Sequence, residues 1–232
     1  KSQSKRDYAF IDEKNYFLNK LLKNDQIKSK VIKINYLKYK KYFEEIKNIY
    51  FNNSSNKQNL SFVINIAKIL KLNLKTVIKT ANKFKGLNYR QQVIYESKKI
   101  LIINDSKSTS FSSTVPLLES YKNIYWILGG LIKKGDKLIL QKKYLSNIKA
   151  FVYGRDGNSF IKALPNQIFY KKTSTLNKLI KDLSNNIKND KNKKVILFSP
   201  SAASFDQFRN FEERGKFFNK KIKYMIKKLK YD

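Results

Sequence analysis

Three short segments of the chain carry Ser or Thr, Gly or Lys residues directly after an apolar run. They are residues 104–109 (NDSKST), 129–133 (GGLIK) and 199–204 (SPSAAS). Hydroxyl groups, backbone N–H groups at helix starts and lysine ammonium groups bind phosphates and carboxylates. If the three segments lie together, they predict a cradle for an anionic ligand.

Each segment taken alone also fits an ordinary structural role. Asp and Ser commonly cap helices, and a Gly pair commonly forms a turn. Residues 195–215 contain no lysine, although the formal net charge of the chain is +33. Further lysines close to the predicted cradle would compete for an acidic ligand. The rings of Phe208 and Phe211 in this stretch are expected to pack in the core, as Phe side chains usually do.

The composition restricts the chemistry that this chain can perform. It contains no Cys and no His, which excludes disulfides, thiolate metal sites and histidine acid–base catalysis. Gly130 and Gly135 have the outer spacing of a phosphate-binding loop, but Asp136 stands where that loop needs a lysine. Carboxylates, lysines, hydroxyls and the charges of a ligand remain as the reacting groups.

The excess of basic residues has two interpretations. There are 50 Lys and Arg against 17 Asp and Glu, which is typical of a nucleic-acid-binding protein. However, the cations are almost all lysine and run from end to end, whereas base recognition favours arginine. We therefore favour a lysine-rich composition without a nucleic-acid partner. No apolar run is long enough to cross a membrane, and no signal peptide is visible.

The cradle needs elements that bring strand ends together. Beyond residue 90, apolar runs alternate with helical periodicity, which predicts an α/β fold with a mostly parallel, Rossmann-like sheet and helices on both faces. Ligands bind such sheets beyond the carboxyl ends of the strands. The expected strands are residues 8–11, 31–34, 92–96, 100–104, 124–130, 149–154, 167–172 and 194–200, and the expected helices are residues 16–22, 59–70, 74–84, 137–147, 159–164, 176–187 and from 206 onward.

Residues 36–55 are polar and are expected to be irregular, with a loop at residues 52–56, where Asn and Ser cluster. In the helix over residues 59–70, the apolar residues Phe62, Val63, Ile66, Ala67 and Leu70 are expected to form one face. A domain boundary is predicted near residues 88–92, which separates residues 1–90 from residues 91–232.

Five motifs together resemble the Mur ligases. They are residues 56–59 (NKQN), 84–90 (FKGLNYR), 103–109 (INDSKST), 127–130 (ILGG) with Lys133 beyond, and 199–215 (SPSAASFDQFRNFEERG). Within the family, the third motif looks like that of the enzymes that add D-glutamate. Ser55 and Tyr89 stand where the family has histidine.

The resemblance implies an ATP-dependent amide ligase of three domains. Its reaction would join D-glutamate to UDP-N-acetylmuramoyl-L-alanine through an acyl phosphate, with Mg²⁺ on the ATP phosphates. Residues 1–90 would be the C-terminal part of an ATPase-type central domain, and residues 91–232 the C-terminal ligase domain. The domain that binds the uridine nucleotide and the phosphate loop are not in these residues, so the resemblance implies a C-terminal fragment that is inactive alone.

The resemblance also implies roles for individual residues. Asn59 and Arg90 would contact the nucleotide, Asp105 would accept from the ribose hydroxyls, and Lys107 would face the phosphates as the catalytic lysine. The D-glutamate carboxylates would be held by Thr109, Lys133, Ser204 and the backbone around Phe211. A cytoplasmic monomer is expected. Two alternatives remain open: a related ligase for another amino acid, and a basic module that binds nucleic acid without catalysis.

Overall fold

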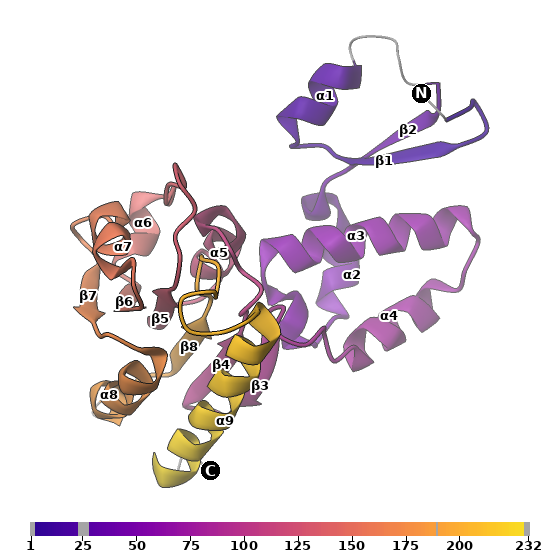
Figure 1. The fold of residues 1–232 in the computed structure, drawn as a ribbon. Coiled ribbons are helices and arrows are strands. Elements are labelled where there is room, and N and C mark those ends of the chain that lie inside the picture. Colours follow the sequence, from indigo (N-terminus) through magenta and orange to yellow (C-terminus); the bar gives the residue numbers. More distant parts are fainter. Residues whose placement is uncertain (1–2, 23–27, 189, 230–232) are drawn as a thin grey trace. The chain divides into compact units, whose positions relative to one another are not determined.

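The computed structural model describes residues 3–22, 28–188 and 190–229 as two compact units that divide between Phe84 and Lys85 (Figure 1). The predicted boundary lay a few residues later. Residues 87–90 belong to the second unit, where the backbone N–H of Lys107 donates to the carbonyl of Tyr89 at 3.0 Å.

The first unit opens with a strand–helix–strand segment. Strand β1 (Tyr8–Asp12) and strand β2 (Lys30–Ile34) pair in parallel, and helix α1 (Tyr16–Leu22) lies between them in the sequence. The predicted strands and helix of this segment are therefore confirmed.

The prediction that residues 36–55 are irregular is wrong, because they contain three short helices. These are η1 (Tyr36–Tyr39), α2 (Lys40–Glu44) and η2 (Ile49–Asn52). The Asn35 and Asn48 side chains accept from the backbone at the starts of η1 and η2, and aromatic side chains of these helices pack against a small core. Capping by nearby Asn side chains and packing against distant residues together stabilise these helices, although the polar composition predicted none.

Helices α3 (Ser54–Ile69) and α4 (Leu74–Lys83) complete the first unit. Asn53 and Asn73 cap them by accepting from backbone N–H groups of the first turn. The loop predicted at residues 52–56 is also wrong, because α3 already begins at Ser54. The predicted apolar face of α3 is wrong at most of its positions, because Val63, Ile66 and Leu70 are exposed. The helix instead buries Leu60 and Ile64, which pack in the core with Phe51 and Ala81, and it also buries the predicted Ala67.

The second unit is built on a six-stranded sheet with the order β3-β4-β8-β5-β6-β7. Only β3 (Gln92–Glu96) is antiparallel, because a tight turn joins it to β4 (Ile100–Asn104). Strands β5 (Ile124–Gly129), β6 (Ile148–Tyr153), β7 (Phe169–Lys172) and β8 (Lys194–Phe198) are parallel to β4. The predicted α/β fold with a mostly parallel sheet is confirmed.

Helices cover both faces of this sheet (Figure 1). Helices α8 (Leu176–Lys188) and α9 (Phe211–Leu229) pack on one face, where the rings of Phe198 and Phe218 stack with centroids 4.2 Å apart. On the other face, Phe111 of α5 (Phe111–Leu118) contacts Trp126 of β5 and Phe160 of α7 (Gly157–Ala163).

Two predicted helices are shorter than expected. The helix over residues 137–147 is reduced to α6 (Lys142–Leu145), and α9 begins at Phe211 instead of residue 206. The later start of α9 has a local cause: the Asn210 side chain accepts from the backbone N–H of Glu213 at 2.8 Å, which caps the helix at that point. No helix in the described part of the chain is long and apolar enough to cross a membrane.

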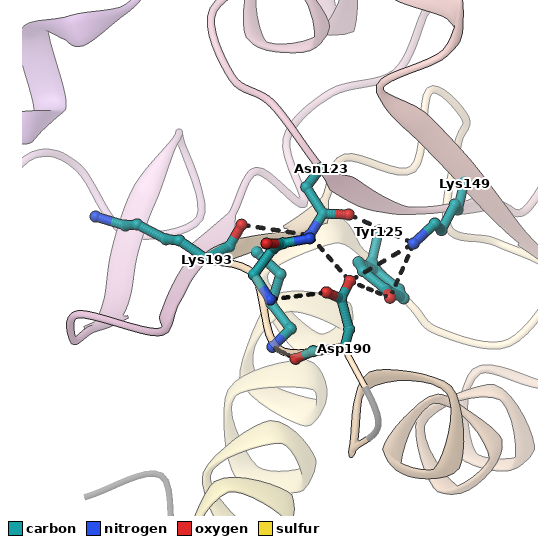
Figure 2. Close-up of polar contacts among 7 residues, drawn as sticks. Asn123, Tyr125, Lys149, Asp190 and Lys193 are labelled. Carbon is teal, nitrogen blue, oxygen red and sulfur yellow. Dashed lines mark hydrogen bonds and ion pairs between the residues drawn. The ribbon is translucent and has the colours of Figure 1, made fainter.

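A polar cluster around Asp190 joins the amino-terminal ends of β5, β6 and β8 (Figure 2). The Asp190 carboxylate accepts from Asn123 Nδ2 at 2.9 Å and from the Tyr125 hydroxyl at 2.8 Å, and it lies 3.6 Å from Lys149 Nζ. Burial alone would raise the pKa of Asp190, but these donors, the N–H of Asn192 and the Lys149 charge lower the pKa to about 2.

This cluster makes the stability of the fold sensitive to acid. Because the pKa of Asp190 falls from 3.8 to about 2 on folding, its carboxylate stabilises the fold at neutral pH, and this contribution is lost as pH falls through the interval between the two values. Asp190→Asn should therefore unfold at lower urea concentration at neutral pH, and its free energy of unfolding should approach that of the wild type near pH 2.

Urea titrations at several pH values test this prediction. Asp182→Asn is a suitable control, since Asp182 lies partly exposed on α8. Equal losses of stability in the two variants at neutral pH would contradict the role assigned to Asp190.

Candidate functional site

Three strand-end loops meet at one edge of the six-stranded sheet. They follow β4, β8 and β5, which are adjacent and parallel, so their carboxyl ends lie side by side. The loops after β5 and β8 are joined by a pair of backbone hydrogen bonds between Leu131 and Ala203, both 3.0 Å long. The Asp136 carboxylate accepts from the backbone N–H of Phe111 at 2.7 Å and thereby joins the loop after β5 to the start of α5.

Asp105 lies at the end of β4 and is only 5% exposed. Its carboxylate accepts from Ser199 Oγ at 2.9 Å and from the backbone N–H of Gln91 at 3.1 Å. Burial raises the pKa of Asp105 to about 7, although these two hydrogen bonds and the charges of Arg90 and Arg214 act in the opposite direction. A carboxylate has about four lone-pair positions, so these two donors leave capacity to accept from a ligand hydroxyl.

Lys107 and Phe211 form a pair beside Asp105. The Lys107 ammonium group lies 4.0 Å from the centre of the Phe211 ring, and both residues are partly exposed. The carbonyl of Phe211 accepts from Ser106 Oγ at 2.8 Å, which fixes the start of α9 against the loop after β4. The Phe211 ring therefore contacts a lysine near the surface, while Phe208 packs against the core as expected.

The three side chains predicted to hold an acidic amino acid lie on the joined loops. Thr109 is exposed and directly precedes Ser110, the capping residue of α5, and Lys133 is exposed on the loop after β5. Ser204 is 3% exposed, and its carbonyl accepts from the backbone N–H of Phe208 at 2.9 Å. The structure thus brings together the loops on which the prediction depends.

Asn59 lies on α3 in the first compact unit, whereas the other predicted site residues belong to the second. It is exposed and lines a pocket of about 560 Å³ between α3 and α4. The pocket is mainly apolar, with walls that include Val63, Leu72, Val77 and Phe84. A flat heterocycle needs such apolar walls together with a polar group that fixes its orientation.

Sequence reasoning missed Arg214, which is fully buried on α9. Its Nε donates to Ser106 Oγ at 3.0 Å, and its Nη2 donates to the carbonyls of Ser106 at 2.6 Å and Ala202 at 3.0 Å. One guanidinium group therefore holds the loops after β4 and β8 together. No local sequence signal points to these partners. In the structure, a side chain at the neighbouring Gly215 would collide with the Tyr89 ring, so α9 passes close to Tyr89 here.

Comparisons with known proteins identify the relatives of this chain. No protein-family model matches it. The chain is 36% identical over 167 residues to UDP-N-acetylmuramoylalanine--D-glutamate ligase from Wolbachia sp. subsp. Brugia malayi, over 72% of this chain and 34% of the relative. It is 33% identical over 209 residues to the protein of the same name from Rickettsia felis, over 88% of this chain and 45% of the relative. The chain thus spans less than half the length of either curated relative.

Solved structures support the fold. The structure of UDP-N-acetylmuramate-alanine ligase MurC from Thermotoga maritima matches with a TM-score of 0.53 and 17% identity, over 74% of this chain and 38% of that one. The structure of MurF ligase from Thermotoga maritima in complex with ADP matches with a TM-score of 0.51 and 17% identity, over 74% and 39% of the two chains. These structures show the fold, and the sequence relatives show that the chain belongs to the Mur ligase family.

Proposed function

We propose that this chain supplies the amino-acid-binding part of an ATP-dependent ligase that adds D-glutamate to UDP-N-acetylmuramoyl-L-alanine in peptidoglycan precursor synthesis. The meeting of the loops after β4, β5 and β8 at one sheet edge carries the proposal. The names of the sequence relatives favour D-glutamate as the amino acid.

In this proposal the exposed Thr109 and Lys133 and the hydroxyl of Ser204 bind the two carboxylates of D-glutamate. A dicarboxylate needs a cation together with hydroxyl or N–H donors, and charge-assisted hydrogen bonds of this kind are the strong ones. The backbone at the start of α9, around Phe211, adds N–H groups at a helix amino terminus, which favour negative charge. The same set would bind a neutral amino acid poorly.

In the second compact unit, ATP would contact Asp105, Arg90 and Lys107. Asp105, which titrates near neutral pH, would accept from the ribose hydroxyls. In the first unit, Asn59 would contact a nucleotide beside an apolar pocket whose walls suit a flat heterocycle. Arg90 and Lys107 would place positive charge near the phosphates. Lys107 would be the catalytic lysine, because its mobile ammonium group can move from the Phe211 ring onto developing phosphate charge.

The reaction needs activation, since a carboxylate is a poor electrophile. The carboxylate of UDP-N-acetylmuramoyl-L-alanine would take the terminal phosphoryl group of ATP to give an acyl phosphate, with release of ADP. The amine of D-glutamate would then form the amide bond, with loss of phosphate and a proton. The chain contributes by orientation: the joined loops hold the amino acid in one place beside the nucleotide.

Mg²⁺ would supply the positive charge that ATP phosphates require in ligase sites. Among the described residues, no group of three or more acidic side chains is arranged to hold a metal ion. We therefore assign Mg²⁺ to the phosphates and derive no step through a protein metal site. We further propose that the enzyme acts in the cytoplasm as a monomer.

The decisive experiment measures amide formation by the ligase that contains this chain. Lys133→Met should raise the KM for D-glutamate by about tenfold or more, because a charged partner of a carboxylate is lost, and it should leave the KM for ATP nearly unchanged. Thr109→Val should act in the same direction. A panel of other amino acids tests the substrate, since a related ligase would prefer another of them.

Lys134→Met provides a matched control, because Lys134 is the exposed neighbour of Lys133 on the same loop. It should leave both KM values unchanged. If Lys133→Met and Lys134→Met behave alike, or if another amino acid is the better substrate, the D-glutamate assignment is wrong.

A further inference from the structure

A buried hydroxyl cluster connects α5 to the loops after β4 and β8. At its centre is Thr114 of α5, which is fully buried. Its Oγ1 lies 2.7 Å from the Oγ atoms of Ser108, Ser199 and Ser201. One threonine therefore contacts the loop that carries Thr109 and the loop that carries Ser204.

The number of partners matches what a hydroxyl can use. A threonine hydroxyl has one proton to donate and two lone pairs that accept, so three partners satisfy it fully. Ser199 donates its proton to Asp105 Oδ2 at 2.9 Å. The oxygen of Ser199 then accepts from Thr114, and Thr114 can accept from Ser108 and Ser201, whose hydroxyls also lie 3.3 and 3.4 Å from the carbonyls of Ser110 and Ser199, respectively. An ionised Asp105 thus fixes the direction of the hydrogen bond between Thr114 and Ser199.

The partner Ser201 has an unusual backbone. Its φ is +54°, in the left-handed region that non-glycine residues rarely adopt. Such a conformation persists only where the surroundings hold it. The hydrogen bond to Thr114 is one of these constraints, and it acts three residues before Ser204.

We propose that Thr114 is a positioning residue, which holds the loops after β4 and β8 in the mutual arrangement that binds an acidic ligand. It touches neither substrate nor nucleotide, and it acts through Ser108, Ser199 and Ser201. The ligand part of this inference rests on the proposed function, whereas the coupling of the two loops does not.

Hydrogen exchange on the 232-residue chain tests the coupling without any ligand. Thr114→Val keeps the shape of the side chain but leaves three buried hydroxyls short of a partner, whereas Thr114→Ser keeps the hydroxyl. Amides of residues 105–109 and 199–204 should exchange at least about tenfold faster in Thr114→Val than in the wild type, in both segments together. Thr114→Ser should exchange within about twofold of the wild type.

Leu183→Ala serves as the control for general destabilisation, since Leu183 is fully buried on α8. It should lower the melting temperature without faster exchange in the two segments. Equal exchange in Thr114→Val and Thr114→Ser, or faster exchange in one segment only, would overturn the proposal. If Thr114→Val does not fold, Ser201→Ala replaces it. Ser201→Ala should speed exchange at residues 199–204, and Thr114→Ser should not. Any other result would also overturn the proposal.

Titration of the ligase that contains this chain with D-glutamate in the presence of ADP, followed by nuclear magnetic resonance, tests the ligand part. The dissociation constant of Thr114→Val should rise by about tenfold or more, and that of Thr114→Ser should stay near the wild-type value. If the wild type binds neither compound while the exchange results hold, the proposed function fails and the loop coupling stands. If the wild type binds and Thr114→Val binds equally well, the positioning role fails and the proposed function stands.

Discussion

Replacing Arg214 with methionine should lower the free energy of unfolding by about 3–6 kcal/mol, because three buried acceptors lose their donor at about 1–2 kcal/mol each. These acceptors are Ser106 Oγ and the carbonyls of Ser106 and Ala202. Methionine fills much of the same space, so the loss measures hydrogen bonding more than cavity formation. Urea unfolding at neutral pH gives the value directly.

Two further variants distinguish the effect of the guanidinium geometry from the effect of a positive charge. Arg214→Lys should recover little of the loss, since one ammonium group cannot reproduce the planar fork that reaches both loops. Arg209→Met should change the free energy of unfolding by less than about 0.5 kcal/mol, because Arg209 is an exposed residue just before α9. If Arg214→Met and Arg209→Met had similar stability, the three hydrogen bonds would not hold the loops together.

Much of the fold could be predicted because its signals are local. The strands of the second unit are apolar runs bounded by polar loops, and α8 shows its buried face as Leu176, Leu179, Ile180, Leu183 and Ile187 at helical spacing. The meeting of the strand-end loops followed from one general property, that parallel strands end at the same edge of a sheet. The residue roles at that edge remain predictions.

The elements that sequence reasoning missed depend on distant partners. Arg214 and Ser106 are 108 positions apart, and Thr114 and Ser201 are 87 apart, so no local pattern connects them. The face of α3 was misjudged for a related reason: Val63 and Ile66 have helical spacing, but Leu60 and Ile64 face Phe51 of the preceding turn and are buried. Periodicity identified the helix, and the packing partner decided which side is covered.

The misjudged Phe211 shows the same limit within the site. Its ring was expected in the core on residue type alone. In the structure the ring lies partly exposed beside the Lys107 ammonium group, at the start of α9. The backbone carbonyl of Phe211 accepts from Ser106 Oγ. A cation over an aromatic face is favourable, so the exposed ring has a local partner that residue type could not reveal.

Replacing Gly130 with alanine should disrupt the edge at which the loops meet. The φ of Gly130 is +126°, and an added Cβ would lie 2.3 Å from the carbonyl oxygen of Ala203. That carbonyl accepts from the backbone N–H of Leu131, so the clash would break the contact that joins the loops after β5 and β8. Strain and the lost contact together should lower the free energy of unfolding by about 3 kcal/mol or more.

Gly135→Ala is a matched control for this prediction. Gly135 also has a positive φ, +76°, but a Cβ there would meet no atom within 4 Å. Its cost should therefore be the backbone strain alone, about 1–2 kcal/mol. The two variants should also differ in ligand binding: Gly130→Ala separates the loops of Lys133 and Ser204 and should lose D-glutamate binding, whereas Gly135→Ala should retain it. Equal stability and equal binding in the two variants would mean that the loops after β5 and β8 need not be joined to form the site.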